Sequence, residues 1–154
     1  MSLSDWERHG WLRTHESSPR EVRELLDVEA RDIKDSRADV LSQAWRMNID
    51  YNAALQAATA DLAAAGYRAS RDQHHYRVIQ SLRETVGVAA STISAFGAFR
   101  KKRNVAGYER TGLVSDVDAD AMYDLAVSIR HDVVAWLRTN YPLTVAPRCS
   151  KHAP

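Results

Sequence analysis

The feature that most constrains the fold is one long stripe of apolar residues at helical spacing. Apolar side chains recur at steps of three and four residues and hold a single face over more than about six turns. The members of this stripe are Val40, Ala44, Met47, Tyr51, Leu55, Ala58 and Leu62. Its second half is rich in alanine, which permits close approach by a neighbouring helix, and Gly66 stands where a C-terminal cap is expected. The pattern predicts a long core helix.

Further helices are predicted on both sides of this one. Ser18, Pro19 and Glu21 have the order of an N-cap, a first-turn proline and a capping box, so a helix is expected from residue 18 to about 34–36. Two more are expected over residues 71–86 and 89–108, and the last from Ser115 to near Asn140. No stretch alternates convincingly between polar and apolar residues. We therefore expect an all-α, single-domain antiparallel bundle of about five helices.

The chain is expected to have one domain with two short extensions. A length of 154 residues allows one sizeable core. Residues 1–17 form an N-terminal arm whose Trp6 and Trp11 are expected to lie on the body, residues 18–141 form the helical bundle, and residues 142–154 form a flexible C-terminal tail.

Composition leaves the partner open but favours a cytoplasmic protein. The formal net charge of +1 neither demands nor excludes a nucleic-acid partner. The only cysteine, Cys149, has no partner for an internal disulfide, which suits a reducing compartment. No apolar run is long enough for a signal peptide or a membrane span. We expect a cytoplasmic location and no association with a membrane.

The densest basic run is the segment RKKRN at residues 100–104, followed by Tyr108 and Arg110. On a helix Arg100, Arg103 and Asn104 share one face, with Tyr108 one turn later. Arginine clamps a phosphate in bidentate fashion, an amide can orient it, and Lys101, Lys102 and Arg110 attract polyanions. This predicts a site for RNA or a nucleotide. The alternative on spacing alone is a solvated helix face with extended lysines.

Other candidate groups indicate no metal or cofactor. His74 and His75 are adjacent, so on a helix one ring is expected to make a core or capping contact and the other to be exposed. The aspartates of residues 116–120 lack the glycine and glutamate of a calcium loop and are interpreted as helix-start residues. The sequence contains no phosphate-binding or dinucleotide-binding glycine motif. Four aromatic residues are expected in the core: Trp45, Tyr51, Tyr76 and Trp136.

Four segments together resemble the small bacterial HEPN domain proteins of the toxin–antitoxin type. They are AALQAATADLAAAGYR, HHYRVIQSLRETVG, RKKRN-x-x-x-Y and SDVDADAMYDLAVSIRHDVVAWL, within roughly residues 20–140. The resemblance implies a helical bundle that pairs as a homodimer. It also implies a role in a toxin–antitoxin or defence locus, with a minimal nucleotidyltransferase as a partner protein and a metal-independent ribonuclease activity.

The family's signature, an RxxxxH motif, is only partly present. Arg103 and Asn104 match its arginine and the following polar residue, but Tyr108 stands where the histidine is expected. The resemblance implies phosphate binding for the arginine and proton transfer for the histidine. Tyrosine is a poor base at neutral pH. Either the pocket is kept as a binding site, or Tyr108 acts with a residue from elsewhere, such as His74 or His75.

Two functions from different classes therefore follow. The first is a HEPN-type protein that binds RNA or a nucleotide through the Arg-Asn-x-x-x-Tyr segment, with metal-independent cleavage of RNA left open. The second is a noncatalytic interaction module that docks a partner protein such as a nucleotidyltransferase. The missing histidine favours the second, and the basic run favours the first.

Overall fold

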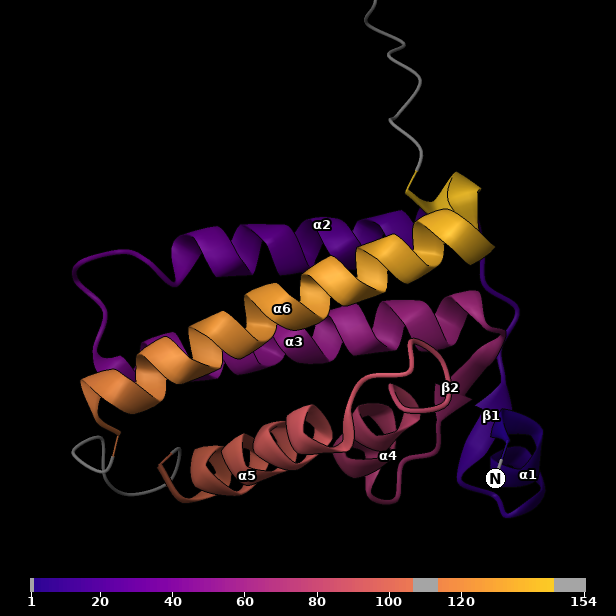
Figure 1. Cartoon of the computed structure of the whole chain (residues 1–154), viewed down its shortest axis with the longest axis horizontal. Helices are drawn as coiled ribbons and strands as arrows, with labels where there is room; N and C mark the ends of the chain where they lie inside the picture. Colours follow the sequence, from indigo (N-terminus) through magenta and orange to yellow (C-terminus); the bar gives the residue numbers. More distant parts are fainter. Residues whose placement is uncertain (1, 107–113, 146–154) are drawn as a thin grey trace, which may run out of the picture.

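The chain folds into a helical bundle with a small sheet at one end (Figure 1). This computed structural model describes residues 2–106 and 114–145, except for the side chains of residues 104–106. Its elements are α1 Leu3–Arg8, β1 Leu12–Thr14, α2 Pro19–Asp35, α3 Gln43–Ala64, β2 Tyr67–Ala69, α4 His74–Ser81, α5 Ala90–Ala106, α6 Asp116–Asn140 and the 3-10 helix Pro142–Thr144. The expected all-α bundle is confirmed.

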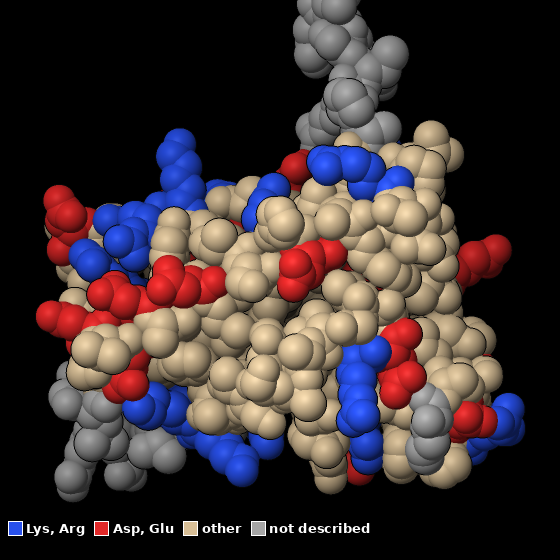
Figure 2. Space-filling model, in the orientation of Figure 1, with Lys and Arg blue, Asp and Glu red and all other residues tan. Residues whose placement is uncertain are grey.

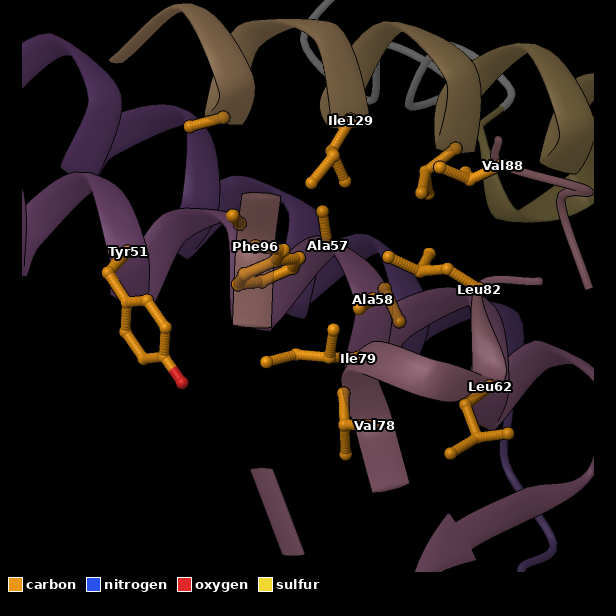
Figure 3. Packing of buried hydrophobic residues seen from close by; sticks show 14 of the residues in the cluster. Tyr51, Ala57, Ala58, Leu62, Val78, Ile79, Leu82, Val88, Phe96 and Ile129 are labelled. Atoms are coloured by element: carbon orange, nitrogen blue, oxygen red, sulfur yellow. The ribbon is translucent and has the colours of Figure 1, made fainter. Parts of the chain in front are cut away.

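The long helix α3 lies at the centre of the bundle. Ser42 accepts a hydrogen bond from the backbone N–H of Trp45 at its start, and Gly66 follows its end with φ +96°. Most alanines on α3 are buried, and α2 and α6 pack closely along this helix (Figures 1 and 3). α2 and α5 run opposite to α3, whereas α6 runs in the same direction as α3 (Figure 1). Small side chains therefore make α3 a platform for the other helices.

Three residues that the sequence placed on the core side are exposed, and one of them is Tyr76 of α4, at 37%. Val40 is 93% exposed because α3 begins only at Gln43, so Val40 precedes the helix. Trp45 is 61% exposed because it is turned by about 100° from its neighbour Ala44, which lies on the buried face. The stripe of buried residues therefore starts at Ala44, and the expectation of a core role for Trp45 and Tyr76 is wrong.

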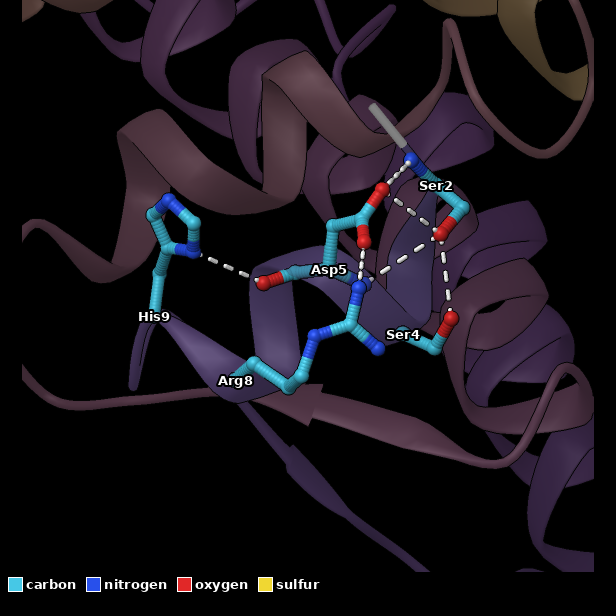
Figure 4. Close-up of polar contacts among 5 residues, drawn as sticks. All are labelled: Ser2, Ser4, Asp5, Arg8 and His9. Atoms are coloured by element: carbon cyan, nitrogen blue, oxygen red, sulfur yellow. Dashed lines mark hydrogen bonds and ion pairs between the residues drawn. The ribbon is translucent and has the colours of Figure 1, made fainter.

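The N-terminal segment contributes to the fold through a sheet that the sequence did not predict. Ser2 caps α1 through a capping box with Asp5 (Figure 4), and Trp6 on this helix is buried with its ring 5.9 Å from that of Trp11. β1 pairs antiparallel with β2, with Leu12 opposite Ala69. Each strand has three residues, which is too short for an alternating pattern to be recognised.

α4 and α5 close the lower side of the bundle in Figure 1. α4 ends at Ser81 rather than near residue 86, and turns follow it. Thr85 in these turns donates a hydrogen bond of 2.7 Å to the buried carboxyl group of Asp61 on α3. α5 is anchored by Ile93 and Phe96, and the Phe96 ring lies among the core side chains (Figure 3). This anchor fixes where the basic end of α5 lies.

Candidate functional site

The basic run occupies the C-terminal half of α5, and its four charged residues divide between two roles. Lys101 is exposed, and Lys102 forms an ion pair of 3.0 Å with Asp118 near the start of α6. Arg100 and Arg103 are partly buried and lie over aromatic rings of the bundle. Figure 2 shows basic side chains along the lower left edge, over this half of α5, beside acidic side chains at the start of α6. Lys102 therefore already has a counter-charge, whereas the two arginines meet aromatic rings.

Both arginines are held by rings rather than by carboxylates. The guanidinium carbon of Arg103 lies 5.1 Å from the centre of the Tyr51 ring, and that of Arg100 lies 5.8 Å from the centre of the Tyr76 ring. The Nε atom of each arginine is shielded from solvent and has no hydrogen-bond partner within residues 2–106 and 114–145. Over the same residues no carboxylate forms an ion pair with either guanidinium. The guanidinium groups of Arg100 and Arg103 therefore have no carboxylate partner among the described residues.

Two histidines from α4 lie beside these arginines. His75 is partly buried, and its Nδ1 lies 3.2 Å from the hydroxyl oxygen of Tyr51. His74 is exposed, and the two imidazole centres are 6.1 Å apart. One ring with a core contact and one exposed ring is the arrangement expected from the sequence. We call Arg100, Arg103, His74 and His75 the arginine–histidine cluster.

The electrostatics of the cluster favour a neutral His75. Burial lowers the pKa of His75 most, and the positive charges of Arg103, His74 and Arg100 lower it further. Burial raises the pKa of Tyr51 to about 12, although both arginines oppose that change. At neutral pH the pair therefore consists of an uncharged imidazole and a protonated phenol.

An open depression of about 590 Å³ adjoins the cluster and is lined by Gln73, His74, His75, Tyr76 and Arg100. Such a volume is within the range of small-molecule sites. Gln73 has φ +51°, a conformation that costs a non-glycine residue energy and that is common at functional sites. As the residue before α4, Gln73 provides no side-chain cap, so the positive end of this helix also adjoins the depression.

Three other predicted site residues cannot be compared with the structure. The side chain of Asn104 lies outside the described residues, as do Tyr108 and Arg110. Whether Tyr108 shares a cleft with Arg103 stays a prediction. Within residues 2–106 and 114–145 no three His, Cys, Asp or Glu residues form a group that could hold a metal ion, and no helix combines the length and the hydropathy that crossing a bilayer requires.

The comparisons with known proteins give no identification. No protein-family model matches the chain, and neither a curated protein nor a solved structure matches it. The functional interpretation therefore depends on the chemistry of the site.

The contact that sequence reasoning missed is the one between Tyr51 and His75. The two residues are separated by 24 positions, and Tyr51 belongs to an apolar stripe that predicts only packing. The hydroxyl was the one available signal, because a buried phenol needs a hydrogen-bond partner. The sequence could not show which residue supplies that partner.

Proposed function

We propose that this chain is a HEPN-type protein that binds RNA by a backbone phosphate at the arginine–histidine cluster. The observation that carries the proposal is the convergence of Arg100, Arg103 and His75 with no carboxylate paired to the arginines among the described residues. Arg100 and Arg103 carry like charges that repel each other, so their arrangement favours an external anion.

The polar groups of the cluster suit a phosphodiester. Guanidinium groups are obligate donors that match phosphate oxygens, and an imidazole donates through one or both nitrogens. The uncapped end of α4 adds further backbone donors beside the depression. Lys101, which is exposed and follows Arg100 directly, adds charge that attracts a polyanion along the same edge.

A binding measurement with a matched control tests the proposal. Fluorescence anisotropy of a labelled oligoribonucleotide should show affinity that falls steeply between about 50 mM and 200 mM salt. Arg103→Ala should weaken binding by about tenfold or more, since it removes charge-assisted hydrogen bonds. The control is Arg138→Ala, which removes the same charge from an exposed position near the end of α6. Equal losses of affinity in the two variants would show that the cluster is not the RNA-binding site.

Competition separates RNA from a free nucleotide as the ligand. Inorganic phosphate and a mononucleotide should compete only at concentrations far above that of the oligoribonucleotide, because a polyanion makes several phosphate contacts. Should the mononucleotide compete as well as the RNA, the site takes a nucleotide and the RNA proposal is wrong.

Ribonuclease activity is a second measurement on the same sample. The protein is incubated with RNA and excess chelator, beside Arg103→Ala to exclude a contaminating nuclease. Cleavage that depends on Arg103 and is lost in Tyr108→Phe would assign catalysis to the tyrosine. Cleavage lost in His75→Ala but kept in Tyr108→Phe would assign proton transfer to the histidine. Binding without cleavage would make the cluster a binding site only.

The proposal also includes a homodimer in a toxin–antitoxin or defence locus, with a nucleotidyltransferase as a candidate partner. The exposed apolar side chains Trp45 and Val117 favour a protein contact, and they support the alternative of an interaction module. Light scattering should give about twice the chain mass of 17.3 kDa. A mass near that of one chain at micromolar concentration would contradict the dimer, and Trp45→Ala tests whether this residue takes part.

A further inference from the structure

Tyr51 contacts the cluster on two sides from the centre of the bundle. Its side chain is fully buried in α3, and its ring packs edge-on against Phe96 at 5.6 Å between centres. The face of the same ring lies under the guanidinium of Arg103, and the hydroxyl reaches Nδ1 of His75. Figure 3 shows this hydroxyl directed away from the packed apolar side chains. One rigid residue therefore touches one arginine and one histidine of the cluster.

The hydrogen bond between Tyr51 and His75 has a preferred direction. A buried phenol must donate its proton to an acceptor or lose the energy of that bond. Among the described residues, Nδ1 of His75 is the single partner of this hydroxyl. If Nδ1 carried the proton and donated to Tyr51, the phenolic hydrogen would have no acceptor there. Donation from Tyr51 to Nδ1 leaves neither group unsatisfied.

We infer that Tyr51 is a positioning residue, whose hydroxyl holds neutral His75 in the tautomer that carries its proton on Nε2. His75 lines the depression beside Arg100, so Nε2–H is available as a donor to a ligand oxygen. This role rests on the proposed function, in which that oxygen belongs to a phosphate. The uncharged imidazole is then a third donor beside two guanidinium groups, and in this tautomer Nε2 cannot accept a proton from a ribose hydroxyl.

A protonated His75 changes the role of Tyr51. Both ring nitrogens then donate, so the Tyr51 hydroxyl must turn and accept from Nδ1. The groups that face His75 are Tyr51 from α3, His74 from α4, and Arg100 and Arg103 from α5, of which the arginines and a charged His74 oppose protonation. A bound phosphate would offset that repulsion. Binding should therefore become tighter as the pH falls, and Tyr51 should matter least where His75 is charged.

Nitrogen-15 NMR of the imidazole rings tests the tautomer without any ligand. In the native protein at neutral pH, His75 should show a protonated Nε2 and an unprotonated Nδ1. Tyr51→Phe keeps the ring against Phe96 and Arg103 and removes only the hydroxyl, so this preference should weaken to a mixture of tautomers. Circular dichroism and a melting curve establish that the variant is folded. A native His75 with its proton on Nδ1 would overturn the inference.

The binding assay tests the consequence for the site. At about pH 7.5, Tyr51→Phe should weaken binding of the oligoribonucleotide roughly two- to tenfold, the effect of a misdirected hydrogen bond, and the difference should shrink toward pH 5. Tyr123→Phe on α6 is the control, because Tyr123 lies outside the cluster and no hydrogen bond to its hydroxyl occurs among the described residues. An equal loss at every pH would indicate a structural role and overturn the inference. If native protein binds no RNA while the tautomer is as expected, the proposed function fails and the positioning of His75 stands.

Discussion

Two of the places where arginine side chains meet the bundle interior differ in the groups that the arginines contact. Between α2 and α6, Arg130 forms an ion pair with Glu29, whose side chain is fully buried. Between α4 and α5, Arg100 and Arg103 meet aromatic rings and His75, with no carboxylate paired to them in the described parts of the chain. The first pair contains its own anion. The second group has room for an anion from outside, so removing an arginine should affect stability at the first place and binding at the second.

The largest effect is expected from Arg130→Ala. It leaves Glu29 buried without its partner, which should cost about 3–5 kcal/mol of unfolding free energy where Glu29 is ionised. Burial raises the pKa of Glu29 to about 7, against the opposing effect of Arg130, so the loss should be greatest near pH 8 and smaller near pH 5. Urea unfolding at both pH values measures it. A loss no larger than that of Arg138→Ala would mean that the ion pair contributes nothing.

Arg103→Ala should show the reverse pattern. RNA affinity should fall by about 1.5–3 kcal/mol, as is usual for hydrogen bonds to a charged group. The unfolding free energy should change by less than about 1 kcal/mol, because the described structure provides no anion that would lose its partner, only the ring contact with Tyr51. Anisotropy and urea unfolding on the same preparations check both. A large loss of stability would show that the cation is structural, and the contrast between the two places would fail.

The helices could be predicted from the sequence because their signals are local. Ser18, Ser42 and Ser115 cap α2, α3 and α6, and Gly66 follows α3, so residue identity and spacing were enough for three of these four positions; the role of Ser42 was not foreseen. Local signals failed where a contact joins distant segments. The pairing of β1 with β2 and the bond from Thr85 to Asp61 depend on the packed bundle, and no periodicity encodes them.

The candidate site was predictable only in part, for the same reason. The spacing of Arg100 and Arg103 places them together on one helix face, and the structure has them there. That Tyr51 joins Arg103 to His75 follows from how α3, α4 and α5 pack, which a single sequence does not reveal. Lys102 was predicted to bind phosphate, but its ion pair with Asp118 occupies it in this structure.

The ion pair between α2 and α6 also predicts how stability depends on pH. The folded-state pKa of Glu29, about 7, lies above its ordinary value of 4.5. The folded protein therefore binds the proton of Glu29 more tightly than the unfolded chain does. The stability that protonated Glu29 contributes is complete below about pH 4.5 and is lost as the pH rises through 7. Glu29→Gln should remove this part of the dependence, which should amount to about 1–3 kcal/mol between pH 5 and 8. If native and variant stability change in parallel across that range, Glu29 is not the group responsible.

The smallest effect at neutral pH is expected from Asp61→Asn on α3. Burial raises the pKa of Asp61 to about 8, so at pH 7 its carboxyl group is mostly protonated, and an amide can accept the same hydrogen bond from Thr85. The unfolding free energy should change by less than about 1 kcal/mol there. The native protein should lose stability as the pH rises through 8, because the buried carboxylate must then ionise without a cation, whereas the variant should not. At about pH 9 the variant should therefore be the more stable of the two in urea unfolding. A native protein that is equally stable at pH 7 and pH 9 would mean that Asp61 does not change its protonation state in this range.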